Sequence, residues 1–280
     1  TYSKVTDYLP GINTTIKLNQ TSNLRITASQ SVIRPELREL SFLNIFDFEL
    51  NASVQGNPNL KRTKISNTDI RYELYPGSGE VFTAGVFYKN FENAIEQIFS
   101  EGSGGASTFS YQNAEKAITY GVEVEARKKL NKFFTFQANA SLVGSKIQDE
   151  NLKLERRLQG QSPYLVNIGL LYDVVEKGLN ATLLFNRIGE RIYLVGDIQA
   201  GSSSPDIYEA PRDLLDFQMS KKLMNNKAEI KFTISDLLNQ QQTFYQNLNT
   251  NNPKYEKSVD AVRFSRKFGS TFGISFNYSL

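Results

Sequence analysis

The feature that most constrains the fold of this chain is an alternation of apolar and polar residues. In residues 134–143, phenylalanine, alanine and leucine occupy the even positions, while polar residues occupy the odd positions up to 141. The pattern recurs in residues 81–89, 120–127, 228–235 and 271–280, with Phe87 as a defect on a polar face. A β-strand with two different faces has this period of two. No segment keeps a helical period, so we predict an antiparallel, all-β fold.

The connections between strands alternate between short and long. Weaker strand signals at 12–19, 23–32, 64–75, 162–175, 178–188 and 212–223 bring the total to about eleven strands, and 37–46 could be a short helix. Short turns at 20–22, 76–78, 130–131, 176–177 and 224–226 alternate with long loops at 33–63, 92–117, 148–161, 189–211 and 238–267. A transmembrane β-barrel places short turns on one side and long loops on the other. The alternation therefore favours such a barrel over a soluble sandwich.

In a membrane barrel the two faces of each strand have different surroundings. We expect lipid-facing positions at Phe134, Phe136, Leu142, Ile230, Phe232, Ile274 and Phe276, and lumen-facing positions at Glu125, Gln137, Asn139 and Lys231. Asp69, Arg71 and Glu73 would form an ion-pair ladder on the lumen face. Period alone does not distinguish this arrangement from a soluble β-sandwich, which stays open as an alternative.

Composition excludes several classes of function. The 280 residues contain no cysteine and no histidine, which removes cysteine nucleophiles, Ser-His-Asp triads and imidazole-ligated zinc sites. The net charge of +3 does not indicate nucleic acid as a partner. We expect no catalytic activity, no cofactor and no resident metal.

Several loop segments carry recognisable motifs. They are Ser31-Val32-Ile33-Arg34-Pro35-Glu36-Leu37-Arg38-Glu39-Leu40, Gly56-Asn57-Pro58-Asn59-Leu60, Tyr120-Gly121-Val122-Glu123-Val124-Glu125, Leu158-Gln159-Gly160-Gln161-Ser162-Pro163-Tyr164, Asn186-Arg187-Ile188-Gly189, Pro211-Arg212-Asp213-Leu214-Leu215-Asp216 and Asp236-Leu237-Leu238-Asn239. In this order, and in register with the strands, they resemble segments of TonB-dependent outer-membrane receptors of the Bacteroidota type. The resemblance covers nearly the whole chain.

The resemblance implies a location, an architecture and partners. It places the protein in the bacterial outer membrane and makes residues 1–280 the C-terminal portion of a 22-stranded barrel, with the N-terminal plug domain and the TonB box not present in this chain. It implies active uptake of a scarce ligand, such as a siderophore, vitamin, glycan or peptide. The implied partners are the TonB complex, through the absent plug, together with outer-membrane lipid or lipopolysaccharide and a surface lipoprotein.

Candidate ligand-binding residues lie in the expected extracellular loops: Arg34, Tyr111, Arg156, Arg157, Phe244 and Tyr245. The basic pairs Arg156-Arg157 and Lys61-Arg62 could grip an anionic ligand. Equally, they could lie in solvated loops or contact lipopolysaccharide phosphate. Tyr111, Phe244 and Tyr245 could stack on carbohydrate. Tyr88, Phe91, Tyr164, Tyr172 and Tyr193 would form an aromatic girdle at the membrane interface.

Two other functions stay open at this point. One is a passive, porin-like barrel, which differs from a receptor in lacking a plug domain. The other is a soluble carbohydrate-binding β-sandwich, which would need no detergent for extraction.

Overall fold

Eleven long antiparallel strands form one curved wall in the structure, a computed structural model that describes residues 5–48, 52–77, 79–101, 107–149, 154–196, 205–248 and 255–279. In their order across the wall they are β1 (Gly11–Lys17), β2 (Ser22–Ile33), β5 (Thr63–Gly77), β6 (Glu80–Glu101), β7 (Ser107–Lys129), β8 (Phe134–Asp149), β10 (Tyr164–Val174), β11 (Leu179–Ile188), β14 (Arg212–Leu223), β15 (Ala228–Ser235) and β18 (Thr271–Tyr278). Among the described residues β1 and β18 do not pair, so the wall is open at both edges.

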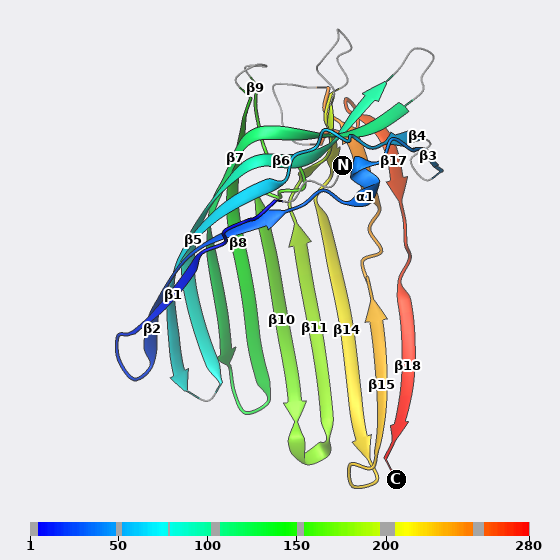
Figure 1. The fold of residues 1–280 in the computed structure, drawn as a ribbon. Helices are drawn as coiled ribbons and strands as arrows, with labels where there is room; N and C mark the ends of the chain where they lie inside the picture. The colour runs from blue at the N-terminus through cyan, green and yellow to red at the C-terminus, as the bar shows by residue number, and fades with distance from the viewer. Residues whose placement is uncertain are drawn as a thin grey trace.

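The long connections all lie at one end of the wall (Figure 1). In the described residues they carry one short helix, α1 (Leu37–Leu40), and seven short strands, β3 (Asn44–Asp47), β4 (Ala52–Gln55), β9 (Leu154–Arg156), β12 (Arg191–Gly196), β13 (Ile207–Glu209), β16 (Gln242–Gln246) and β17 (Ala261–Arg266). The short turns, including the 3-10 turn Val175–Lys177, lie at the opposite end. The predicted all-β fold, the strand number and the clustering of long loops are confirmed. Within the described ranges, no helix has the length and apolar character needed to cross a membrane.

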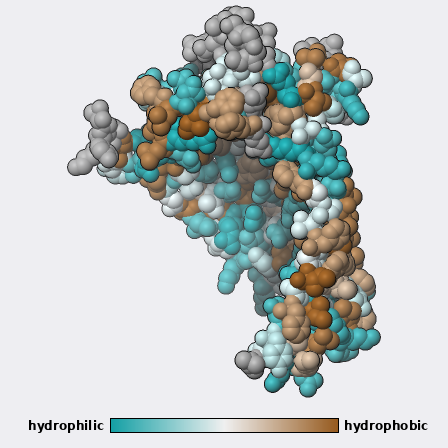
Figure 2. Space-filling view, turned by 90° about the vertical axis from the view of Figure 1, so that its right-hand side faces the viewer, coloured by the Kyte–Doolittle hydropathy of each residue, from teal (hydrophilic) through white to brown (hydrophobic). Residues whose placement is uncertain are grey.

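Register separates the two faces of the wall as predicted. One row across the convex face runs Phe82, Ala126, Ala138, Ile168, Phe185 and Leu215, each residue paired with the next. Leu142 and Ile274, on the same face, are 65% and 80% exposed. The opposite face carries the polar residues, and Figure 2 shows the hollow of the wall lined mostly by hydrophilic residues. So large an apolar exposed surface requires an apolar solvent.

Two predicted boundaries were wrong. β6 and β7 extend far past the predicted strands 81–89 and 120–127 and keep one register across Asn93, where φ is +56°. On the loop side of Asn93 both faces of the hairpin are covered, so the sequence no longer alternates. The predicted helix over 37–46 is helical only from Leu37 to Leu40, and Asn44–Asp47 is a strand.

The packed core lies at the loop end, because a single curved sheet has no interior of its own. Ala52, Val54, Phe99, Phe109, Leu194, Ile207 and Phe244 form one buried cluster. Ala94, Ala114, Ala117 and Ile147 form a second cluster nearby. We call this assembly the loop platform; it is made of β3, β4, β9, β12, β13, β16, β17 and the loop-side ends of β6, β7 and β8.

Candidate ligand-binding site

Ion pairs cross neighbouring strands on the concave face. Arg25 Nε lies 3.0 Å from Glu73 Oε1, and Tyr75 donates a hydrogen bond of 3.2 Å to the same carboxylate. Arg71 Nη2 lies 3.7 Å from Glu123 Oε2. The predicted ladder of Asp69, Arg71 and Glu73 is therefore replaced by pairs between strands, since residues two apart on one strand have closer neighbours across the sheet.

Three asparagines form a hydrogen-bonded row on the same face. Asn186 donates to Asn167, and Asn167 donates to Asn139, each at 2.6 Å. The three residues are direct partners in the register of β8, β10 and β11. They line a hollow of about 470 Å³ whose other polar side chains are Glu125, Arg127, Gln137 and Asp216. Donors and acceptors of both charges thus meet at one place on the concave wall.

The loop platform is held by aromatic packing. The ring centroids of Phe244 and Phe264 lie 4.3 Å apart, and those of Tyr193 and Phe244 lie 4.5 Å apart. Phe99 and Phe109 pair across the β6–β7 hairpin at 5.4 Å. Because these rings come from three long connections, they fix those loops relative to one another.

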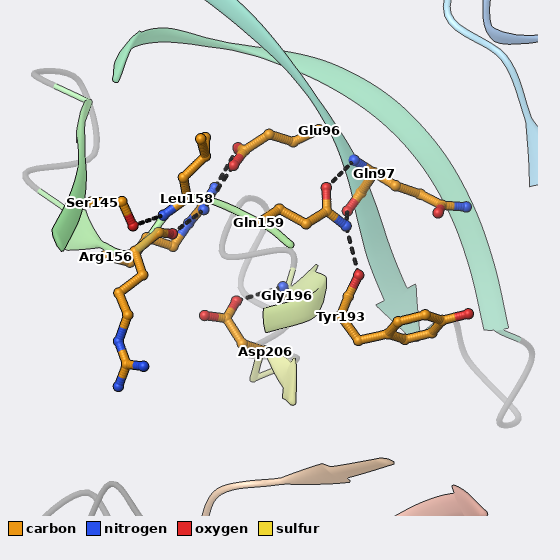
Figure 3. A network of polar contacts seen from close by, with 10 residues as sticks. Glu96, Gln97, Ser145, Arg156, Leu158, Gln159, Tyr193, Gly196 and Asp206 are labelled. Carbon is orange, nitrogen blue, oxygen red and sulfur yellow. Dashed lines mark hydrogen bonds and ion pairs between the residues drawn. The ribbon is translucent and has the colours of Figure 1, made fainter. Parts of the chain in front are cut away.

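A buried ion pair joins one of these connections, residues 92–117, to another long connection, residues 148–161. Arg156 donates two hydrogen bonds to Glu96, at 2.9 and 2.5 Å, and the Glu96 side chain has no exposed surface. Gln159 lies between Gln97 and Tyr193 (Figure 3), donating 2.7 Å to the Tyr193 carbonyl and accepting 2.7 Å from the Gln97 amide. A side-chain amide thereby satisfies backbone groups from two strands that do not pair at that point.

A second polar cluster surrounds Tyr245. Its hydroxyl donates a short hydrogen bond to Glu190, and Arg157 Nη2 lies 3.7 Å from the other carboxylate oxygen. Burial raises the pKa of the Glu190 carboxyl, although the Tyr245 hydrogen bond and the Arg157 charge oppose the rise. Burial and the neighbouring Asp206 charge raise the pKa of Tyr208 to about 12. Burial and the hydrogen bond to Glu190 raise the pKa of Tyr245 as well, so Tyr208 and Tyr245 both stay protonated at neutral pH.

The structure places the sequence-predicted site residues in different surroundings. Phe244 and Tyr245 are fully buried in the loop platform, and the Arg156 side chain is only 10% exposed. Tyr111 packs partly buried against the same core, while the Arg157 side chain is 37% exposed. Arg34 lies apart from them and pairs with Asp7 at 2.9 Å. The structure brings five of the six residues into the platform, and their binding role stays a prediction.

The structure contradicts the predicted aromatic girdle at two of its five positions, and the other three stay a prediction. Tyr88, Tyr164 and Tyr172 share the convex face with the apolar rows. Phe91 instead packs against the second buried cluster and Tyr193 against the first. Both lie in stretches where loops cover the strand, so their position near a strand end did not mean exposure.

Sequence reasoning missed Glu96, Glu190 and the asparagine row as a unit. Glu96 lies in a predicted loop, and its partner Arg156 is sixty residues away. Asn139 was expected to face the lumen, but its pairing with Asn167 and Asn186 depends on a register that no local motif encodes. Among the described residues, no group of acidic side chains is arranged to hold a metal ion.

Comparisons with solved structures find siderophore receptors and a copper transporter among the similar folds. A mutant of the ferric enterobactin receptor PfeA from Pseudomonas aeruginosa superposes with a TM-score of 0.64 at 16% identity, over 98% of this chain and 40% of that one. The siderophore receptor PirA from Acinetobacter baumannii gives 0.64 at 15% identity, over 98% and 41%. The copper transporter OprC gives 0.65 at 15% identity, over 96% and 39%. The chain thus spans about 40% of the length of these proteins.

The wall has the apolar convex face, polar concave face and one-sided loops of a transmembrane β-barrel, and these solved proteins share its fold. The model of the Outer membrane protein beta-barrel family matches residues 2–278, and the chain belongs to this family of the outer membrane. No curated protein sequence matches it.

Proposed function

We propose that residues 1–280 form the C-terminal portion of the barrel of a TonB-dependent outer-membrane receptor, of the type found in Bacteroidota. The receptor takes a scarce ligand inward, with energy supplied through TonB to a plug domain that we place outside these residues. The ligand class is a siderophore, vitamin, glycan or peptide. The process is transport, with no covalent step.

One observation supports this proposal over a passive porin or a soluble β-sandwich. The chain combines a polar concave wall, which has cross-strand ion pairs and the asparagine row, with a packed loop platform at one end. A wide polar passage and a structured outer surface are what a receptor needs to bind a large ligand and let it pass. The fold itself is shared with two siderophore receptors and a copper transporter.

Within this proposal, the predicted ligand-binding residues have two different roles. Arg156, Phe244 and Tyr245 hold the loop platform rigid, because each is buried against partners from another loop. Arg157 and Tyr111 keep exposed surface and contact the ligand. Rigid placement of a few polar contacts reduces the ordering cost of binding.

Uptake assays test the proposal. The gene product that contains this chain is expressed in cells with and without TonB, and uptake of labelled ferric siderophores, cobalamin, oligosaccharides and peptides is measured. We expect uptake of one class that is lost without TonB or without the proton-motive force. Uptake of small solutes independent of TonB would support a passive porin instead.

A variant then tests the ligand contact. Arg157→Gln should weaken uptake of that class, whereas Lys132→Gln, in a turn at the opposite end, should leave it unchanged. Equal uptake by both variants would remove Arg157 from the binding surface.

A further inference from the structure

A pocket of about 630 Å³ gathers four basic residues from the two ends of the long connection between β2 and β5. Arg34 follows β2, and Lys61, Arg62 and Lys64 lie at the start of β5. Leu40 and Leu60 add apolar surface, and Glu92 is an acidic residue in its lining. We call it the basic pocket. Lys61 and Arg62 form the basic pair singled out in the sequence, which the proposed uptake function does not use.

Register places the basic pocket on the convex side of the wall. Lys64 pairs with Val32 and Glu92, and it shares a face of β5 with Ile70, which is 44% exposed. A second hollow of about 330 Å³ adjoins it through Arg62, Lys64 and Glu92, and includes the convex-face positions Gln30, Ser66 and Asn90. The pocket is thus outside the barrel, where a ligand passing through the lumen does not reach.

The height of the pocket corresponds to lipid headgroups. Aromatic residues of membrane barrels gather at the interface, and we take its level from Tyr88 and Tyr120, which pair on the convex face, with Thr68 at the same level of β5. Lys64 lies four residues further toward the loops, about 13 Å along the strand. Because barrel strands are tilted, this distance keeps Lys64 within the headgroup layer above the apolar band.

The charges of the pocket are not fully compensated. Asp7 lies 2.9 Å from both Arg34 and Arg62, and Glu92 is opposite Lys64 in the register, which leaves two positive charges over. Arg62 Nη1 is buried and makes no well-aligned hydrogen bond even with Asp7. The excess of positive charge in the lining favours binding of an additional anionic group.

We propose that the basic pocket binds the phosphate of a lipid A headgroup in the outer leaflet, with the acyl chains lying along the convex faces of β2, β5 and β6. Ile26, Ile70 and Val86 form a paired apolar row on those strands, and they are 37%, 44% and 52% exposed. Basic groups above an apolar surface fit both parts of such a lipid. The proposal rests on the outer-membrane family and is independent of what the receptor takes up.

Lipid retention and binding test this site in the protein as its gene encodes it. Protein purified from outer membranes is assayed by mass spectrometry for bound lipid A, then titrated in detergent with diphosphorylated lipid A and with its dephosphorylated form. The variant is Lys61→Gln/Arg62→Gln/Lys64→Gln. The matched control, Lys132→Gln/Lys177→Gln/Lys227→Gln, removes three charges from the turns at the opposite end.

We expect the variant to bind diphosphorylated lipid A about fivefold more weakly for each charge removed. The control should bind diphosphorylated lipid A as the unmodified protein does. The control and the unmodified protein should both bind the dephosphorylated lipid more weakly than the diphosphorylated lipid. If the triple variant does not fold, Lys64→Gln and Arg62→Lys carry the same test, and a loss is expected in the first.

Three results would overturn the proposal. One is equal binding by the variant and the unmodified protein, and another is an equal loss in the control, which would indicate a general charge effect. The third is displacement of the lipid by equimolar inorganic phosphate, which would identify a site for free anions.

Discussion

At the scale of single residues, the loop platform depends on charges that are buried and paired. Glu96 has no exposed side-chain surface, and its carboxylate is compensated by the two hydrogen bonds from Arg156. Removing one partner of such a pair leaves an uncompensated charge, which costs far more than the pair itself contributes.

Arg156→Met should therefore destabilise the loop platform by about 3–5 kcal/mol. The double variant Glu96→Gln/Arg156→Met, which has no charge to compensate, should recover most of this loss. Hydrogen exchange of amides in β12 and β13, compared with those in β15, measures the change. A single variant no less stable than the double variant would show that the pair has no such role.

Glu190 gives the loop platform a dependence on pH. Burial raises the pKa of its carboxyl, so the folded platform holds the proton more tightly than the unfolded chain does. Stability then falls as the pH rises from the ordinary value of 4.5 through the raised pKa, and the loss is complete above it. Glu190→Gln should flatten this profile, as followed by hydrogen exchange in β16 corrected for its intrinsic pH dependence. An unchanged slope in the variant would assign the effect to another group.

At the scale of elements, each strand of the wall has one face toward lipid and the other toward water. On β15, Phe232 pairs with Met219 and Ile274 on the convex face, while the adjacent Thr233 pairs with Gln218 and Gly273 on the concave face. The two positions are neighbours in sequence but lie on opposite sides of the sheet.

A lysine at these two positions should have unequal effects. Phe232→Lys should cost about 2–4 kcal/mol at bilayer mid-depth, because the charge faces lipid, and Thr233→Lys should cost little. Refolding into lipid bilayers at increasing denaturant concentration measures both. Equal penalties would show that the assignment of faces is incorrect.

The wall could be predicted from the sequence because lipid and water impose opposite requirements on alternate residues. Even Phe87, the defect on a polar face, has a local explanation: it lies over Gly121, where a Cβ atom would be 2.7 Å from the Phe87 ring. The loop platform could not be predicted, since β12 and β16 are covered on both sides and do not alternate. Arg157 and Glu190 meet only through tertiary packing that no local pattern encodes.

At the scale of the whole molecule, the described wall has two open edges. Within the described parts of the chain, β1 pairs only with β2, and β18 pairs only with β15. Unpaired backbone groups are not tolerated in the hydrocarbon of a bilayer, so a barrel closes its edges. In the complete barrel we expect other strands to pair with both.

The 280 residues expressed alone should therefore aggregate or close incorrectly, and should not transport. Reconstitution into liposomes, with solute uptake as the readout, tests this expectation. Selective uptake by the isolated chain without TonB would instead indicate a small, self-sufficient barrel.

The central claim is that the convex face contacts lipid and the concave face contacts water. Because the chain contains no cysteine, single cysteines at positions 229–234 of β15 can be labelled with a fluorophore without background from these residues. In reconstituted protein, lipid-borne quenchers should act at 230, 232 and 234, and a water-soluble quencher should act at 229, 231 and 233. Quenching that does not alternate, or that alternates with the opposite phase, would contradict the account.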